Sequence, residues 1–249
     1  MLQAENLTKY FNRDTASQIL ALDHLTLQLN EKEFAVIVGS NGSGKSTLLN
    51  LIAGNYLPDE GRIKINGNDV TTKQDYKRSK WIARVFQDPV QGTAPDLTLL
   101  DNFRLAFLRT KPKGFRIGIN SSFRNSVREK VAVLNLGLEY KLNTLAGKLS
   151  GGQRQALTLL MASMDDPKIL LLDEPTAALD PRASEIVMEL AAHLISKQKL
   201  TAILVTHNLR IASHYGSRLI MMDKGRIMQD LDEELKKNIS LHEMQSWFV

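Results

Sequence analysis

The sequence contains no cysteine, which excludes disulfide bonds and thiolate-bound metal ions. This composition is consistent with a cytosolic protein. No apolar run reaches the roughly 20 residues that a helix needs to cross a bilayer. Residues 1–7 lack the basic stretch and the following apolar stretch of a secretory signal, so we expect no signal peptide.

Neither sign of charge is in large excess. The 32 Lys and Arg residues against 27 Asp and Glu residues leave a net charge of +5. This balance fits a nucleic-acid partner, an acidic membrane surface or no charged partner, and the last explanation is the simplest. With 249 residues, 43% of them hydrophobic and 24% charged, the chain can form one large globular domain or one domain with an inserted subdomain.

One glycine-rich stretch has the pattern G-x-x-x-x-G-K-[ST] of a phosphate loop. Its residues are Gly39, Ser40, Asn41, Gly42, Ser43, Gly44, Lys45, Ser46 and Thr47. The apolar run 34–38 before it predicts a buried strand, and residues 47–53 after it predict a helix that ends at Gly54. This order favours a nucleotide site over a glycine-rich turn that binds no ligand.

The residue types in this loop suit phosphate for simple physical reasons. Glycines let the backbone come close to a ligand, and the N–H groups at a helix start attract negative charge. We expect Lys45 to reach the β- and γ-phosphates of a nucleotide and the Ser46 hydroxyl to hold Mg²⁺.

A second turn carries groups that suit an anion. Ser150, Gly151, Gly152 and Gln153 precede an apolar helical pattern, so Ser150 can cap a helix whose first N–H groups face a phosphate. A plain helix cap is the alternative. The phosphate loop in the same chain favours a second phosphate-binding turn.

Acidic residues follow the apolar run 168–173, which is typical of a central parallel strand. Ligands of open α/β sheets bind at the carboxyl ends of such strands. We expect Asp173 to hold Mg²⁺ through water and Glu174 to orient or deprotonate the attacking water, whereas capping of the next turn is the alternative. His207 follows the predicted strand 201–206 at the same edge and is expected to contact the γ-phosphate.

The remaining pattern alternates strands and helices around a helical middle. Further strands are predicted at 24–29, 62–65, 82–86, 218–223 and 226–228, and further helices at 101–108, 122–136 and 181–197. The tail 231–249 predicts one or two short helices, with Phe248 as a packing residue. Six basic residues between 111 and 130 fit a solvated helix face better than a docking or lipid-facing surface: Lys111, Lys113, Arg116, Arg124, Arg128 and Lys130.

Taken together, these residues resemble the nucleotide-binding domains of the ATP-binding-cassette family over essentially the whole chain. The matching segments are its phosphate loop (39–47), signature sequence (149–153), acidic strand motif (169–174) and D-loop (178–180), with the single residues Phe11, Gln87 and His207. The resemblance implies an α/β fold with a phosphate-loop NTPase core, a mostly parallel central sheet and an N-terminal antiparallel β layer. The core would comprise 1–87 and 161–249, and residues 88–160 an inserted helical subdomain.

The resemblance also implies roles that the residues alone leave open. Phe11 would stack on adenine, although a core aromatic is an equal alternative from the sequence. Gln87 would contact Mg²⁺ and couple the nucleotide to the helical subdomain, and Asp180 would lie at the nucleotide interface. ATP at Lys45 of one copy would be closed by Ser150, Gly151, Gly152 and Gln153 of another, in a head-to-tail homodimer.

The implied partners are a membrane permease and an extracellular substrate-binding protein, with no nucleic acid, at the cytoplasmic face of the membrane. Residues 84–95 and 218–222 resemble a subgroup whose permeases resemble those for branched-chain amino acids, nucleosides and sugars, with some members assigned to aromatic amino acids. The expected function is ATP hydrolysis that powers uptake of a small solute such as an amino acid. A soluble cassette ATPase serving an assembly such as an iron–sulfur scaffold is the alternative.

Overall fold

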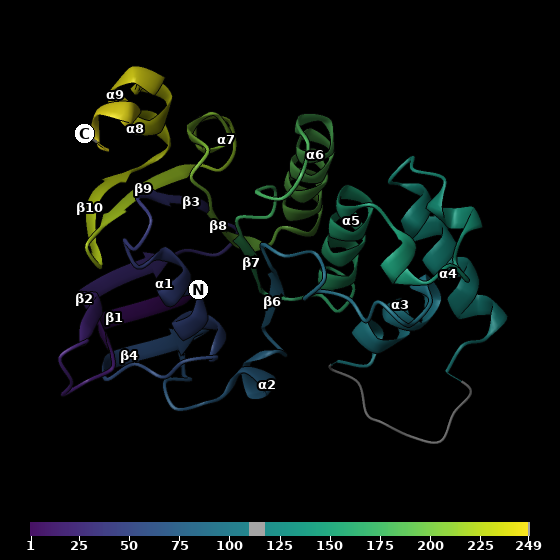
Figure 1. The fold of residues 1–249 in the computed structure, drawn as a ribbon, viewed down its shortest axis with the longest axis horizontal. Helices are drawn as coiled ribbons and strands as arrows, with labels where there is room; N and C mark the ends of the chain where they lie inside the picture. Colours follow the sequence, from purple (N-terminus) through teal and green to yellow (C-terminus); the bar gives the residue numbers. More distant parts are fainter. Residues whose placement is uncertain (110–117, 249) are drawn as a thin grey trace.

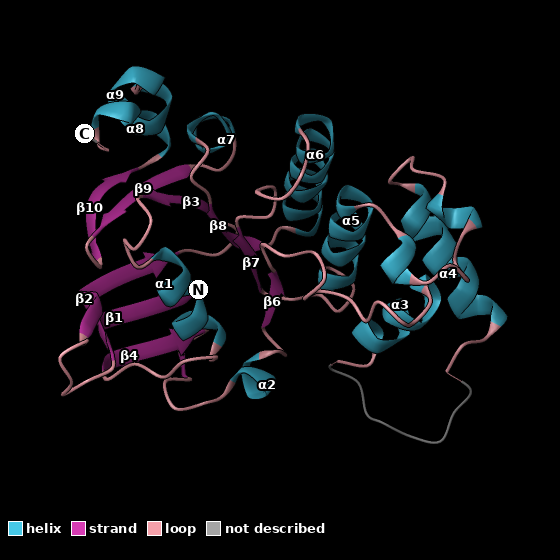
Figure 2. Cartoon of the chain, in the orientation of Figure 1, coloured by secondary structure: helices cyan, strands magenta, loops and turns pink. Residues whose placement is uncertain are grey.

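The structure is a computed structural model that describes residues 1–109 and 118–248. Its strands form two sheets, and a group of helices extends away from them to one side (Figure 1). Figure 2 shows this division clearly, with the strands at one end of the molecule and α3 (Leu99–Phe107) and α4 (Ser121–Ala132) at the other.

The larger sheet has six strands in the order β10-β9-β3-β8-β7-β6. The strands from β9 to β6 are parallel to their neighbours, and only β10 runs antiparallel. This confirms the predicted mostly parallel sheet. The bounds are β3 (Phe34–Gly39), β6 (Ile82–Val85), β7 (Ile169–Asp173), β8 (Thr201–Val205), β9 (Arg218–Asp223) and β10 (Arg226–Leu231).

The smaller sheet is the predicted antiparallel layer. Its order is β2-β1-β4-β5, and every neighbouring pair is antiparallel. The bounds are β1 (Leu2–Phe11), β2 (Ile19–Leu29), β4 (Glu60–Ile65) and β5 (Asn68–Asp69).

The core lies on both faces of the larger sheet. Along β3, Val36 and Val38 belong to one buried cluster, and Ala35 and Ile37 to the other. Successive side chains of a strand point to opposite faces, so a strand covered on both sides is apolar throughout. The first cluster joins the sheet to α5 (Gly151–Ala162) and α6 (Pro181–Gln198), and the second joins it to the smaller sheet and α1 (Lys45–Ala53).

The helical region contains α3, α4 and α5, with short 3₁₀ turns at Leu138–Tyr140 and Ala146–Lys148. Helix α5 continues to Ala162, past the predicted boundary at residue 160. Of the six basic residues singled out above, Lys111, Lys113 and Arg116 lie outside the described residues, and Arg124 donates to Asn143 Oδ1 at 3.0 Å.

The remaining helices are short. They are α2 (Asp75–Arg78), α7 (Leu209–His214), α8 (Glu233–Asn238) and α9 (Leu241–Ser246). The last two match the short helices predicted for the tail. Across residues 1–109 and 118–248, no helix combines the length and the apolar character that a membrane crossing requires.

Candidate active site

The phosphate loop joins the end of β3 to the start of α1. A Cβ atom on Gly39 would lie 2.3 Å from the Met222 carbonyl oxygen, so this position has no room for a side chain. Gly44 has a φ of 99°, in the left-handed region that glycine adopts most readily. Helix α1 begins at Lys45, which places its unpaired N-terminal N–H groups at the loop.

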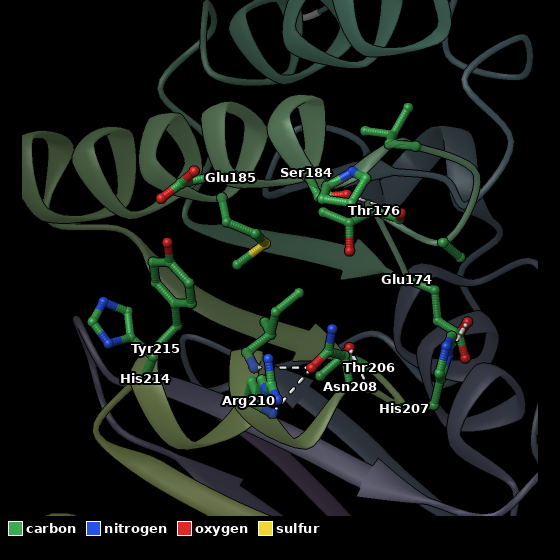
Figure 3. Close-up of a pocket in the computed structure, with 15 residues that line it drawn as sticks. Glu174, Thr176, Ser184, Glu185, Thr206, His207, Asn208, Arg210, His214 and Tyr215 are labelled. Carbon is green, nitrogen blue, oxygen red and sulfur yellow. Dashed lines mark hydrogen bonds and ion pairs between the residues drawn. The ribbon is translucent and has the colours of Figure 1, made fainter.

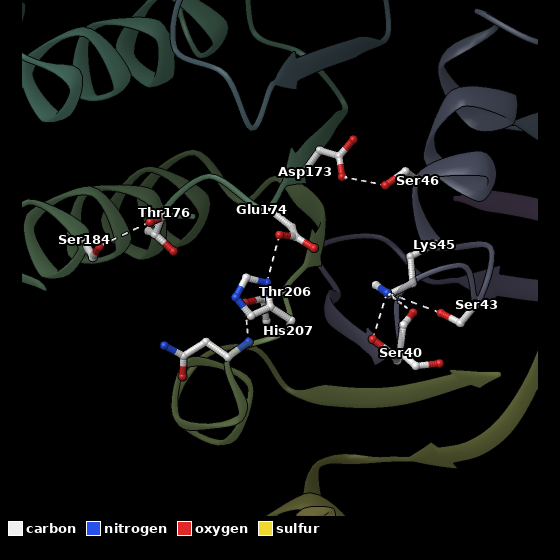
Figure 4. A network of polar contacts seen from close by, with 12 residues as sticks. Ser40, Ser43, Lys45, Ser46, Asp173, Glu174, Thr176, Ser184, Thr206 and His207 are labelled. Atoms are coloured by element: carbon white, nitrogen blue, oxygen red, sulfur yellow. Dashed lines mark hydrogen bonds and ion pairs between the residues drawn. The ribbon is translucent and has the colours of Figure 1, made fainter. Parts of the chain in front are cut away.

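The Lys45 ammonium is buried inside this loop. Its Nζ donates to the carbonyl oxygens of Gly39 and Ser40, both at 2.8 Å, and to Ser43 Oγ at 3.3 Å (Figure 4). Burial lowers the pKa of Lys45, whereas the nearby carboxylates of Glu174 and Asp173 act in the opposite direction. The loop therefore holds a positive charge in place with oxygen acceptors that a phosphate can replace.

Asp173 ends β7 and faces the start of α1. Its Oδ1 accepts from Ser46 Oγ at 3.3 Å, as Figure 4 shows, and its Oδ2 accepts from Arg84 Nη2 at 2.6 Å. The Arg84 and Asp173 side chains are only 11% and 12% exposed. Arg84 also donates to Asn50 Oδ1 at 2.6 Å, so it connects β6, α1 and the end of β7.

These oxygen groups fit Mg²⁺. Mg²⁺ is usually held by one or two carboxylates together with substrate phosphates and water. Asp173 and Ser46 supply such a set, and the exposed Gln87 lies in the same region. In the described part of the chain, no three His, Asp or Glu side chains gather into a metal cage.

Glu174 and His207 form a pair. Glu174 Oε2 and His207 Nδ1 lie 2.9 Å apart, and Figure 4 shows the two side chains pointing toward each other. Glu174 has a φ of 43°, and its N–H donates to the Val205 carbonyl at 2.9 Å. Strained backbone of this kind clusters at functional sites. Here it accompanies a Glu174 side chain that is directed toward His207, whereas Asp173 faces Ser46 (Figure 4).

Most of these groups share one pocket of about 760 Å³. It is lined by the loop, by Gln87, Glu174 and His207, and by Leu209 of α7. The structure therefore brings together Lys45, the candidate base Glu174 and His207, which was predicted to contact the γ-phosphate. Loop residues that line the pocket are Gly39, Ser40, Asn41, Gly42, Gly44, Lys45, Ser46 and Thr47.

The second predicted phosphate-binding turn lies elsewhere in the chain. Ser150 caps α5 by accepting from Gln153 N at 3.2 Å, and Gln153 Oε1 accepts from Ser150 N at 3.1 Å. A Cβ on Gly152 would lie 2.6 Å from Ala183 Cβ, so Gly152 also permits the close packing of α5 on α6. None of these residues lines the loop pocket, and Asp180 acts as the N-cap of α6.

Phe11 does not line the pocket either. It ends β1, and its ring packs edge-on against Tyr56, with 5.4 Å between the ring centres. In the structure, Tyr56 is the aromatic neighbour of the Phe11 ring. Stacking of Phe11 on adenine therefore remains a proposal.

Four pocket or site residues were not predicted from the sequence: Arg84, Leu209, Gln245 and Phe248. An arginine on a strand carries no functional signal in the sequence. Only its contact with Asp173 in the structure identifies Arg84 as a site residue. Gln245 and Phe248 of the α9 segment line the loop pocket, and Phe248 is 40% exposed. Phe248 was expected to be a packing residue, but its side chain is exposed at this pocket. Met244, which the sequence also marks as a packing residue, is the buried anchor of the tail.

A second pocket of about 600 Å³ adjoins the first and shares Glu174 and His207 with it. Figure 3 shows that it lies between α6 and α7. Tyr215 lines it, and burial together with the carboxylates of Glu189 and Glu185 raises the pKa of that phenol.

Comparison with known proteins agrees with this geometry. The sequence model of the family described as ABC transporter matches residues 22–177. A tyrosine transport ATP-binding protein of Clostridioides difficile (strain R20291) is 39% identical over 251 residues, which cover 100% of this chain and 98% of the relative. The sulfate/thiosulfate import ATP-binding protein CysA of Pseudomonas aeruginosa (strain PAO1) is 36% identical, with 92% of this chain and 65% of the relative covered.

A solved structure is similar over nearly the full length. The dimeric post-hydrolysis structure of the ATP-binding cassette MJ0796, bound to ADP and Pi, has a TM-score of 0.80 and 31% identity, and the match covers 94% of this chain and 99% of that one. Family match, sequence relatives and fold agree with the loop, the acidic strand end and the Glu174–His207 pair. The chain therefore belongs to the ABC transporter family and is one of its ATP-binding cassette ATPases.

Proposed function

We propose that this chain is the ATPase subunit of an importer that takes up a small solute through a separate membrane permease. The observation that carries the proposal is the pocket in which Lys45 lies with the Glu174–His207 pair. A nucleotide held there by the loop would have its terminal phosphate beside a carboxylate that can act on water.

Glu174 is the candidate general base for hydrolysis. It accepts a proton from the attacking water, whose oxygen forms a bond to the γ-phosphorus while the bond to the β–γ bridging oxygen breaks. His207 holds the carboxylate through the 2.9 Å contact, and Lys45 neutralises charge on the phosphates. Mg²⁺ supplies further positive charge there when bound by Ser46, Asp173 and Gln87.

The working unit is proposed to be a head-to-tail homodimer. Lys45 and Ser150 belong to different parts of one chain, and the Ser150 turn does not line the loop pocket. A second copy would place its Ser150–Gln153 turn over the first copy's loop, and twofold symmetry would create two such sites. The dimeric MJ0796 cassette is a precedent for this assembly in a protein 31% identical to this chain.

The proposed solute is an amino acid, with an aromatic one as the first to test. The Clostridioides difficile relative named for tyrosine transport matches the chain from end to end, and segments 84–95 and 218–222 resemble a subgroup with some members assigned to aromatic amino acids. Recognition of the solute would lie in the permease and in an extracellular binding protein.

The test begins with the partners. The tagged chain is purified from its native cells in mild detergent, and the proteins that accompany it are identified by mass spectrometry. A permease with several membrane spans is the expected partner. A soluble scaffold with no membrane protein would overturn the importer proposal and favour the soluble ATPase.

Uptake then identifies the solute. Cells that lack the chain are supplied with the natural sequence or with Glu174→Gln, and accumulation of labelled tyrosine, tryptophan and leucine is measured. We expect the natural chain, but not the variant, to restore uptake of at least one of them. Equal uptake of all three amino acids with and without the chain would contradict the proposed solute, whereas the partnership with a permease is tested separately by the purification.

A further inference from the structure

The segment that follows α8 reaches the rim of the nucleotide pocket. Gln245 and Phe248 line this pocket together with the loop residues Ser40, Asn41 and Gly42. Both side chains are exposed, and Phe248 is 40% exposed. Hydrolysis as derived above uses neither of them.

This segment is firmly attached to the core. Met244 is fully buried, and Trp247 packs against the cluster that covers one face of the larger sheet. Ser240 and Glu243 form a capping box at the start of α9, with Glu243 Oε2 accepting from Ser240 N at 2.8 Å. A capping box and a buried anchor fix a short helix that would be unstable alone.

The preceding helix is anchored as well. The buried Lys236 ammonium of α8 donates to the carbonyl oxygens of Tyr215 and Gly216, the latter at 2.7 Å. Helix α9 packs against α7, which starts two residues after His207. The aromatic side chain of Phe248 is therefore presented at a fixed place beside the catalytic pair.

An exposed aromatic ring at the edge of a site gains free energy when another surface covers it. The Ser150–Gln153 turn does not line the pocket of its own chain, and in the homodimer proposed above this turn comes from another copy. That copy would approach over Ser40, Asn41 and Gly42, and these residues share the pocket rim with Gln245 and Phe248. The exposed surface of α9 is thus continuous with the surface on which the dimer closes.

We propose that Gln245 and Phe248 contact the second copy of this chain when the nucleotide pocket closes. The proposal rests on the homodimer described under Proposed function and extends its interface to α9. In a twofold dimer each such contact occurs twice. A substitution at one position therefore removes two contacts from the dimer interface.

The absence of cysteine permits a direct test, because a single thiol can be introduced and read without background. Phe248→Cys is made in a Glu174→Gln chain, which should hold ATP without turnover. The rate of maleimide labelling is measured without nucleotide, with Mg-ADP and with Mg-ATP. With Mg-ATP alone we expect labelling to slow by about tenfold or more, as for a side chain that enters a packed interface.

Leu241→Cys in the same background is the matched control. Leu241 starts α9 and is 39% exposed but does not line the pocket, so its labelling should be unchanged by ATP. Equal slowing by ADP and ATP at position 248 would mean that the nucleotide covers the ring and would overturn the proposed contact. Unchanged labelling at position 248 with ATP would overturn it too.

Sedimentation of the same samples separates the two proposals. If the Glu174→Gln chain forms no dimer with ATP, the homodimer fails and the α9 contact fails with it. If a dimer forms while position 248 stays reactive, only the α9 contact fails. As a second measurement, Phe248→Ala should raise the dimer dissociation constant about tenfold, as a buried aromatic contact does, while Leu241→Ala should not.

Discussion

At the scale of single residues, the Asp173 carboxylate accepts hydrogen bonds from the Ser46 hydroxyl and from the Arg84 guanidinium. Arg84 contributes a 2.6 Å ion pair and Ser46 a longer hydrogen bond of 3.3 Å. Since both charged side chains are nearly buried, the arginine compensates a carboxylate that would otherwise be poorly solvated. Arg84 thus holds Asp173 in the position where a metal ion would need it.

Replacing Arg84 with alanine should therefore lower stability through Asp173. We expect Arg84→Ala to reduce the free energy of unfolding by about 2–4 kcal/mol, because it leaves a buried carboxylate without its cation. Saturating Mg-ADP should remove part of this deficit, since the metal ion supplies the missing positive charge. Urea unfolding of both chains, with Mg-ADP and with ADP plus EDTA, measures the effect. An equal deficit under both conditions would argue against a metal ion at Asp173.

The sequence identifies the residues of this site that belong to contiguous patterns. The loop, Asp173 and Glu174 could be predicted because each comes at the end of an apolar strand, where glycine or acidic residues replace the apolar run. Arg84 and Phe248 could not be found in this way, because their roles depend on which residues of other elements they contact. Phe11 shows the reverse case, since a plausible aromatic position in the sequence packs against Tyr56 and stays outside the pocket lining.

At the scale of elements, the predicted strands and helices agree closely with the structure, because buried parallel strands and capped helices leave strong local signals. The order of strands within each sheet is not a local property. The resemblance to a known family implied a mostly parallel sheet and an antiparallel layer, but neither it nor periodicity predicted the strand order. Helix α5 shows what local patterns miss. Gly152 belongs to the turn predicted to bind phosphate, but it also allows α5 to pack closely against α6.

The packing role of Gly152 can be tested separately from its role in the turn. Gly152→Ala should destabilise the fold by about 1–3 kcal/mol, because the added Cβ would overlap Ala183. Adding Ala183→Gly should restore most of that stability. Gly151→Ala is the matched control, because its Cβ meets Leu179 only at an ordinary 3.4 Å. Thermal unfolding with ATPase rates shows whether the rescued double variant also regains activity. Failure of Ala183→Gly to restore stability would contradict the packing explanation.

The anchoring of α8 predicts a dependence on pH. Burial lowers the pKa of Lys236 from 10.5 to about 8, although Glu233 acts in the opposite direction. Between these values the unfolded chain binds more protons than the folded chain, so the contribution of Lys236 to stability rises with pH. From pH 8 to 9.5 this rise should be about 1–2 kcal/mol.

Urea unfolding of the natural chain and of Lys236→Gln at several pH values isolates this contribution. The rise should be missing from the variant, which cannot release a proton there. Lys237→Gln is the control, because Lys237 lies on the same helix, is exposed, and pairs with Glu233 at 2.7 Å. Parallel pH curves for the natural chain and Lys236→Gln would rule out the assigned shift.

At the scale of the whole molecule, the phosphate loop and the Ser150–Gln153 turn, which we propose to bind the same nucleotide in a dimer, lie apart in one chain. The pocket is lined by the loop between β3 and α1 and by Leu209 of α7, whereas the Ser150 turn starts α5. Figure 1 shows α5 on the side of the larger sheet from which the helical region extends. The larger sheet and the α5–α6 packing fix the loop and the turn, so a single copy cannot fold one onto the other without unfolding its core. Completion by a second copy leaves both cores intact.

Two inactive variants should therefore restore each other. Lys45→Ala removes the loop cation but keeps the Ser150 turn. Ser150→Asp keeps the helix cap, because aspartate is a good N-cap residue, but places a negative charge where a phosphate would bind. In an equal mixture, half of the dimers contain one of each variant, and each of these has one intact site of two. The mixture should recover about a quarter of the natural ATPase rate.

The double variant Lys45→Ala/Ser150→Asp, mixed with Ser150→Asp, is the decisive control. This pairing leaves no site with both an intact loop and an intact turn, so it should show no recovery. Ser150→Asn, which keeps the cap without the charge, should retain activity. Steady-state phosphate release measures all of these samples at protein concentrations that support dimers. Recovery limited to the sum of the two separate variants would show that the copies do not share independently working sites, and the dimer proposed here would have to be replaced.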